Sequence, residues 1–283
     1  MQTITVDDVQ NFVDSLVARG LSPKSVKGIT SALSQILKLA RRKDLIRFNP
    51  AEDVELPSAK PKAVRPPSPH AIHEAIEKAI ERGEPDRAAI IRLQAATGMR
   101  RGEVAGLRWV DVVLDSEPPQ LTIERAIADL RGNGDGPPPR EVKSTKTETG
   151  IRTIGIDEET AEVLREHRMR TEELAKELGF EKLPPDAFVF WPPREGPLTP
   201  CAPQSITKMY RTIAGEGGLR PHQLRHFSVT QLLAAGVPEV EVMGRHGHAS
   251  ASSMKPYRHW IRAKDRMSTE AIRDVLGSQD SST

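Results

Sequence analysis

Four short clusters of the chain gather arginine, lysine, histidine and tyrosine, which together can bind an anion and attack it. The first cluster runs from Thr97 to Glu103, where a glycine permits a tight turn and Arg100 presents a planar, permanently charged fork. The second contains Lys146, on the turn of an expected hairpin, where a flexible ammonium can deliver a proton to a leaving oxygen. Taken alone, Arg100 and Lys146 are each more often ordinary solvated surface residues.

The third cluster, His222-Gln223-Leu224-Arg225-His226, opens a helix that we expect to begin at Pro221. Residues three apart share a helical face, so His222 and Arg225 should point the same way while Leu224 packs inward. The N-terminal end of such a helix also favours an anion. Taken alone, His222 could equally be a structural residue.

The last cluster contains His246, His248 and, further along the chain, Tyr257. A lone tyrosine is usually a packing residue with a wet tip. The histidines of the last two clusters also allow a zinc site as an alternative, but no cysteine pair or glutamate completes a usual ligand set at familiar spacing. The sequence therefore predicts a site with no metal and no cofactor.

The four clusters in this order resemble the motifs of the tyrosine recombinase family, also called phage integrases. The resemblance extends over nearly the whole chain. It implies that Tyr257 is a nucleophile that attacks a DNA phosphate, and that Arg100 and Arg225 hold the non-bridging oxygens of that phosphate. His222 and His248 would assist the two arginines.

The resemblance further implies that Lys146 is the general acid for the leaving oxygen, and that Glu103 is a buried carboxylate that positions its neighbours. His246 stands where the family usually has leucine before its Gly-His pair, and the spacing to Tyr257 favours His248 as the phosphate ligand. This set of residues also suits the chemistry, because phosphoryl transfer without a metal needs fixed cations to neutralise the developing negative charge.

Helices are the main elements expected to position these residues. Thr5 and Asp8 begin one amphipathic helix that Gly20 ends, and Ser22 before Pro23 caps a longer helix that reaches about Ala40. Further helices are expected over residues 70–82 and 85–97, and strands over 121–124, 151–156 and 188–190, with a Gly/Pro-rich hairpin loop at 131–139.

The expected fold class is thus mainly α with a small antiparallel sheet, α+β. A helical core-site DNA-binding domain should occupy residues 1–57, and a Pro-rich basic linker residues 58–69. A tyrosine recombinase catalytic domain with a C-terminal tail should occupy residues 70–283. The resemblance also suggests a small integrase that lacks the extra N-terminal domain for arm-type sites.

Charge is segregated along the chain even though its formal net value is only +2. Acidic residues crowd the stretch 157–186, which phosphates would repel, whereas basic residues crowd the N-terminal helices and the linker. The candidate DNA-binding residues are Lys24, Lys27, Arg41, Arg42, Lys43, Lys62 and Arg65. The single cysteine, Cys201, excludes an intramolecular disulfide, and no targeting or membrane segment is evident, so we expect a bacterial cytoplasmic protein.

The predicted function is that of a site-specific DNA recombinase that cleaves and rejoins DNA through a 3′-phosphotyrosine intermediate without ATP, in integration and excision of a phage or mobile element. A dimer-resolving recombinase and a non-catalytic DNA-binding protein of the same fold remain alternatives. The expected partners are core-type attachment sites in double-stranded DNA and further copies of the chain, which would be a monomer in solution and a tetramer at synapsis.

Overall fold

The computed structural model describes residues 4–58, 65–130, 139–144, 150–215 and 218–247, together with Met254 and Tyr257. Lys62, Lys146, His248 and the C-terminal tail, which the sequence singled out, lie outside the described residues. The chain divides into two compact units, residues 1–62 and 63–283, and the division falls within the Pro-rich stretch.

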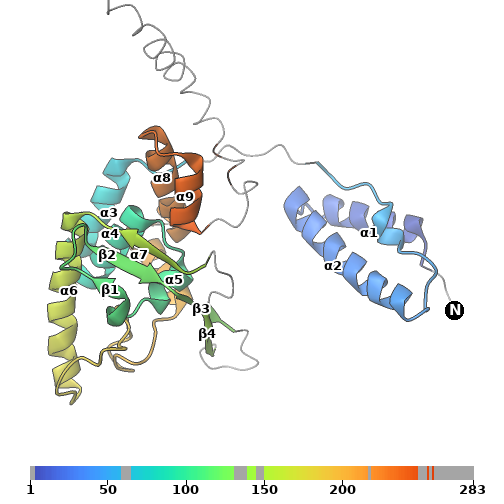
Figure 1. Ribbon diagram of the computed structural model, residues 1–283. Helices are drawn as coiled ribbons and strands as arrows, with labels where there is room; N and C mark the ends of the chain where they lie inside the picture. The colour runs from blue at the N-terminus through green and yellow to red at the C-terminus, as the bar shows by residue number, and fades with distance from the viewer. Residues whose placement is uncertain are drawn as a thin grey trace, which may run out of the picture. The chain divides into compact units, whose positions relative to one another are not determined.

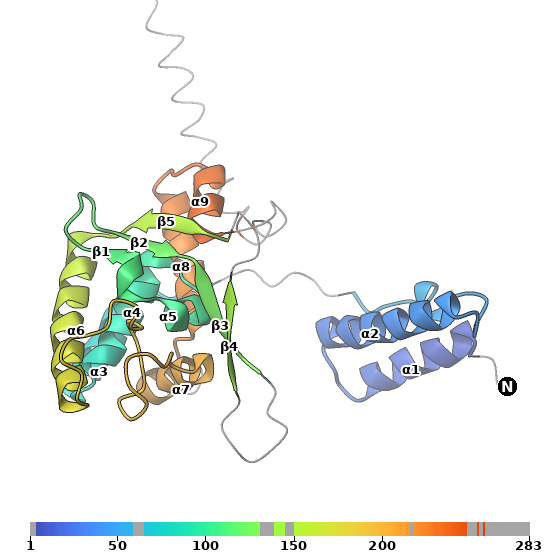
Figure 2. The same ribbon diagram turned by 60° about the horizontal axis from the view of Figure 1, so that its bottom comes forward.

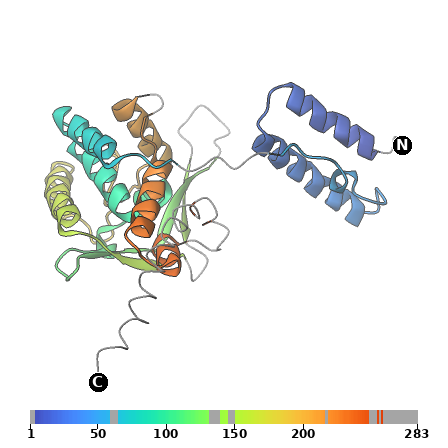
Figure 3. The same ribbon diagram turned by 90° about the horizontal axis from the view of Figure 1, so that it is seen from above.

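The first unit is a pair of helices, α1 (Val6–Ala18) and α2 (Pro23–Arg42), followed by the short 3-10 turn η1 (Pro50–Glu52), as Figure 3 shows. The predicted caps are confirmed: the Thr5 side chain and the carboxylate of Asp8 satisfy each other's backbone N–H groups, and the Ser22 side chain caps α2. Two small apolar clusters join the elements: one consists of Val9, Leu37 and Ala51, and the other of Val13, Leu16 and Val26.

The second unit is built mainly of helices (Figure 1). They are α3 (Pro69–Glu81), α4 (Pro85–Thr97), α5 (Arg101–Gly106), α6 (Glu158–Glu177), α7 (Pro203–Ala214), α8 (Pro221–Ala234) and α9 (Glu239–His246), with the 3-10 turn η2 (Trp109–Asp111). Helix α4 is central, because α3, α6 and α8 all pack against it. Because α4 and α8 are covered by other elements on several faces, neither needs a polar face, and both are only weakly amphipathic.

Two small antiparallel sheets complete the second unit (Figure 2). One has the order β1 (Val112–Val113), β2 (Gln120–Ile123), β5 (Arg152–Gly155), and the other pairs β3 (Arg125–Asp129) with β4 (Arg140–Ser144). The predicted strands at 121–124 and 151–156 are therefore present and adjacent, whereas β3 and β4, which flank the expected hairpin loop at 131–139, were not predicted as strands. A further prediction was wrong: residues 188–190 form no strand, and Phe188 makes only an isolated bridge with Arg108.

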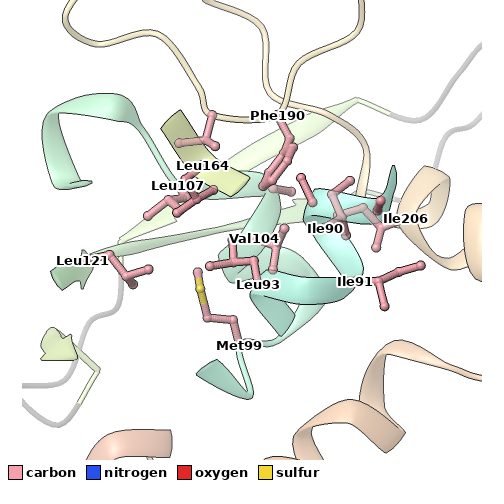
Figure 4. Packing of buried hydrophobic residues seen from close by; sticks show 14 of the residues in the cluster. Ile90, Ile91, Leu93, Met99, Val104, Leu107, Leu121, Leu164, Phe190 and Ile206 are labelled. Atoms are coloured by element: carbon pink, nitrogen blue, oxygen red, sulfur yellow. The ribbon is translucent and has the colours of Figure 1, made fainter. Parts of the chain in front are cut away.

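One large apolar core fills the second unit between the helices and the sheet (Figure 4). Alternation along β2 and β5 places Leu121, Ile123 and Ile154 in this core, where they meet residues of α4 such as Leu93. The predicted fold class, mainly α with small antiparallel sheets, is confirmed. None of the helices in the described part of the chain is long and apolar enough to cross a membrane.

Candidate active site

The first arginine cluster forms a tight turn between α4 and α5. Gly98 ends α4 with a left-handed φ of 65°, and a Cβ on it would lie 2.5 Å from Nε2 of His246. Both the conformation and the contact therefore require glycine. The turn is held from beneath, because the Gln94 amide donates to the Met99 carbonyl at 3.0 Å and the Tyr210 hydroxyl donates to the Gln94 oxygen at 2.8 Å.

Glu103 lies under this turn as a carboxylate that is only 3% exposed. It accepts from the Arg100 backbone N–H and from Nη1 of Arg100, both at 2.8 Å, and from Nη2 of Arg152 on β5 at 2.9 Å. Burial by itself would raise the pKa of Glu103, but the charge and hydrogen bonds of Arg152, with those of Arg100, hold it below its ordinary value. Glu103 is thus an ionised anchor for two arginines.

The last three carbonyls at the C-terminal end of α9 each accept from a different arginine. Nε of Arg152 donates to the Arg245 carbonyl at 2.8 Å, Nη2 of Arg225 to the His246 carbonyl, and Nη2 of Arg100 to the Gly247 carbonyl at 3.3 Å. Carbonyls at a helix C-terminus lack partners within the helix and carry partial negative charge, so they suit cations. This helix end therefore brings together arginines from β5, α8 and the start of α5.

Arg225 is the most deeply buried of these arginines, at 2% exposed. Its Nη1 also donates to the Gly98 carbonyl at 3.0 Å, so it ties the arginine turn to the end of α9. Burial, reinforced by repulsion from Arg100, lowers the pKa of Arg225 to about 10, which still leaves it charged at neutral pH. Leu224 beside it is fully buried, as predicted.

His246, which was the second choice for a phosphate ligand, packs inside the fold. It is fully buried, its Nδ1 lies 2.9 Å from the Val242 carbonyl and its Nε2 lies 3.1 Å from the Ser228 hydroxyl. Its role is therefore to fix α9 against α8 and the turn at Gly98. This geometry favours His248 over His246 for any contact with substrate, although His248 itself lies outside the described residues.

Between α5, α7 and the start of α8 lies a cavity of about 350 Å³. Among the described residues, those that line it are strongly cationic and include no carboxylate. They are Met99, Arg100, Arg101, Thr207, Arg220, Pro221, His222 and Arg225. His222 and Arg225 thus face the same space, as their helical spacing predicted. The cavity suits a phosphate-sized anion.

Tyr257 does not line this cavity, but it lies near Arg225, which does, and it is only 3% exposed. Its ring packs in an apolar cluster with Val229, Leu233 and Val242 of α8 and α9. Burial raises the pKa of the Tyr257 hydroxyl to about 12, and the nearby charge of Arg225 only partly opposes this shift. The hydroxyl is hydrogen-bonded to Nδ1 of His226.

His226 links Tyr257 to His222 on the cavity wall. The His222 and His226 rings meet edge to face with their centroids 4.5 Å apart, and the His226 and Tyr257 rings are 5.5 Å apart. Burial, followed by repulsion from His222 and Arg225, lowers the pKa of His226 to about 4, so the ring is neutral at pH 7.

The structure thus brings together the predicted residues Arg100, Glu103, His222, Arg225 and Tyr257. Sequence reasoning missed His226, which was considered only as a zinc ligand, and Arg152, which was given no role. A signal for Arg152 was present: it shares a strand face with Ile154 and Ile156, and an arginine on a buried face needs a carboxylate. No sequence signal pointed to Gln94 or Tyr210. In the described part of the chain, no group of three or more His, Cys, Asp or Glu side chains could hold a metal ion.

The second unit is mainly helical with two small antiparallel sheets, and it holds a cavity lined by four arginines with a buried tyrosine near it. These features indicate one class of protein, and comparison with known proteins indicates the same class. The model of the phage integrase family matches residues 69–263. An integrase of Bacillus subtilis, ICEBs1 integrase, is 26% identical over 286 residues, which cover 98% of this chain and 72% of that protein. A XerC-like tyrosine recombinase of Caldanaerobacter subterraneus subsp. tengcongensis is 26% identical over 95% of this chain and 70% of its own length.

Among solved structures, the Tn1549 transposon integrase in complex with a circular intermediate DNA superposes with a TM-score of 0.74 at 21% identity, over 96% of this chain and 86% of that one. The chain therefore belongs to the phage integrase family. It is a tyrosine-type site-specific recombinase.

Proposed function

We propose that this recombinase is the integrase of a mobile element or phage, that it acts on double-stranded DNA, and that Tyr257 is its nucleophile. The observation that carries the proposal is the cationic cavity beside Tyr257, lined by Arg100, His222 and Arg225. A scissile phosphate in this cavity would meet the permanent positive charges of the arginines that line it, which neutralise the charge that develops during phosphoryl transfer. Tyr257 would form the phosphodiester bond to the 3′ side and release the 5′ oxygen.

Two features support a tyrosine nucleophile that becomes active only with substrate. Like any tyrosine, Tyr257 is protonated at neutral pH, and burial raises its pKa to about 12, so its phenol is harder to ionise in the free protein than an ordinary one. Its burial away from the cavity lining means that it has to shift toward a bound phosphate. Lys146 and His248 remain the proposed general acid and second histidine.

Core-site DNA is the proposed ligand of the first unit. The basic residues of α2 are exposed, and at 3.6 residues per turn they fall within an arc of about 100° beside its buried face. The residues in this arc are Lys24, Lys27, Lys38, Arg41 and Arg42. Lys43 caps the helix, and Arg65 and Lys62 of the linker are the remaining proposed DNA contacts, of which Lys62 lies outside the described residues. A cationic helix face of this kind suits the phosphates of a DNA groove.

A covalent-adduct assay tests the catalytic part of the proposal. The protein is incubated with a nicked half-site cut from the element's own attachment DNA, so that the released strand diffuses away and the adduct accumulates. We expect a denaturation-resistant protein–DNA adduct with the wild type and none with Tyr257→Phe. An adduct that persists in Tyr257→Phe would disprove the nucleophile, and binding without any wild-type adduct would favour the non-catalytic alternative.

Integration and dimer resolution share this cleavage step, and the relatives carry both integrase and XerC names. The similarity to a transposon integrase in complex with a circular intermediate favours a mobile-element role. We further propose a monomer in solution that assembles as a tetramer on paired sites. Light scattering of the protein alone and of the protein with two site duplexes tests this, and a complex that stays at one copy per site would contradict it.

A further inference from the structure

The hydrogen bond between Tyr257 and His226 is not accounted for by the roles above. It joins the proposed nucleophilic oxygen directly to a ring nitrogen. His226 is half-buried, and its ring also makes an edge-to-face contact with His222, which lines the cavity. The imidazole therefore bridges the apolar pocket of Tyr257 and the wall of the cavity.

We propose that His226 is a catalytic residue that takes the phenolic proton of Tyr257 as its oxygen attacks the phosphate. The inference rests on the proposed function, in which Tyr257 is the nucleophile. In the resting state the Tyr257 hydroxyl donates to Nδ1 of His226, and the ring carries its own proton on Nε2.

The proton and the bonds balance as follows. The Tyr257 oxygen forms a bond to phosphorus, the bond from phosphorus to the 5′ oxygen breaks, and the phenolic proton moves to Nδ1 of His226. The departing 5′ oxygen takes its proton from a separate general acid, for which Lys146 is the candidate. In the rejoining step the His226 imidazolium returns its proton to the Tyr257 oxygen as that oxygen leaves phosphorus.

The charges around His226 determine when this transfer becomes favourable. Among the described residues, the titratable or charged groups that face His226 are His222 and Arg225 on its own helix and Tyr257 from the C-terminal segment. Burial and repulsion from His222 and Arg225 oppose a positive charge on His226, which keeps it a weak base in the free protein. A phosphate in the cavity adds negative charge next to both of them and so raises the basicity of His226. Proton acceptance is thereby coupled to substrate binding.

Asparagine in place of His226 separates the two roles that the residue could have. Its amide oxygen can still accept a hydrogen bond from the phenol near the position of Nδ1, but an amide cannot take up the proton. If His226 only holds Tyr257, His226→Asn should react as the wild type does. If His226 is the proton acceptor, His226→Asn should fold and bind DNA normally but form the adduct slowly.

The assay measures adduct formation from a nicked half-site in which sulfur replaces the 5′ bridging oxygen. A thiolate leaves without protonation, so the rate reports the nucleophile's proton and not the general acid's. At neutral pH we expect His226→Asn to be slower by about 100-fold, within the range of general-base effects. The wild-type rate should level off at high pH, whereas the variant's rate should keep rising toward the pKa of the phenol.

Gln231→Ala is the matched control, because Gln231 lies on the exposed side of the same helix. The variant and control should share the wild-type unfolding temperature and DNA affinity. His226→Asn with a wild-type rate and pH profile would overturn the proposal while Tyr257→Phe still abolished the adduct. An adduct in Tyr257→Phe would instead show that the proposed function itself is wrong.

Discussion

Glu103 and Arg152 form a buried ion pair whose rupture should destabilise the catalytic unit strongly. Their side chains are 3% and 7% exposed and their closest atoms lie 2.9 Å apart. Removal of one partner from such a pair leaves an uncompensated buried charge and costs about 3–5 kcal/mol. A whole domain has only about 5–15 kcal/mol of stability. We therefore expect Glu103→Gln and Arg152→Met each to remove a large part of the free energy of unfolding.

Arg100 supplies the contrast within the same cluster. Its Nη1 lies 2.8 Å from the same carboxylate, but its side chain is 49% exposed. Solvent screens such a pair, so Arg100→Met should cost about 1 kcal/mol or less. The measurement is urea unfolding followed by tryptophan fluorescence, because all 3 tryptophans of the chain lie in the second unit.

The double variant Glu103→Gln/Arg152→Met tests the electrostatic reasoning. With both charges removed, the cost should fall below the sum of the two single costs by roughly 1–3 kcal/mol. Equal costs for Arg100→Met and Arg152→Met would refute the argument from burial. Strict additivity in the double variant would show that the two residues stabilise the fold independently.

Three further outcomes can be measured on the full chain. Gly98→Ala should lower the free energy of unfolding by about 2 kcal/mol or more, because the strain of a left-handed φ adds to the clash with the His246 imidazole of α9. Gly83→Ala is the control, since Gly83 has a φ of 70° but no neighbouring atom within 4 Å of an added Cβ. An equal loss of stability in Gly83→Ala would show that the clash with His246 costs nothing. Tyr210→Phe should cost about 1–3 kcal/mol in urea unfolding, because it removes the buried hydrogen bond to Gln94, and no loss would mean that this bond does not stabilise the turn. The pKa of Asp86 is lowered overall, because its histidine and arginine partners outweigh the opposite effect of burial. The stabilisation from Asp86 is therefore present above its ordinary pKa of 3.8 and is lost as the pH falls. Asp86→Asn should be less stable than the wild type at pH 7, with a difference that shrinks by about pH 3, and a constant difference would contradict this.

The sequence predicted helix boundaries well where capping residues mark the start of a helix. The capping pair Thr5 and Asp8 and the Ser22-Pro23 start define α1 and α2 almost to the residue. Strands β3 and β4 on either side of the expected loop were missed, because Arg125–Asp129 has only one buried apolar residue, Ile127, so its alternation is hardly visible. The strand prediction for residues 188–190 was wrong for the opposite reason. This run is apolar, which is typical of a buried strand, but it lies in the core as an irregular segment.

The site was predictable as a set of residue types and not as a set of contacts. Arg100 and Arg225 were identified from their motifs, but neither motif indicates that their guanidinium groups bind successive backbone carbonyls of α9. Backbone acceptors are the same for every sequence, so no residue type marks them. Likewise, His226 adjoins Arg225 in the chain, yet its bond to Tyr257 depends on how a distant segment folds back onto α8.

The cationic and nucleophilic halves of the site are held in different ways, and this determines what DNA has to supply. Arg100 and Arg225 are fixed before any phosphate arrives, because Glu103 and the end of α9 already hold them. A guanidinium has five N–H donors, so each arginine keeps donors for a phosphate in the cavity that it lines. Tyr257 packs instead in an apolar cluster, where its hydroxyl is hydrogen-bonded to His226. Binding should therefore depend on the arginine anchors, whereas the rate after binding should depend on how readily Tyr257 reaches the phosphate and passes its proton to His226.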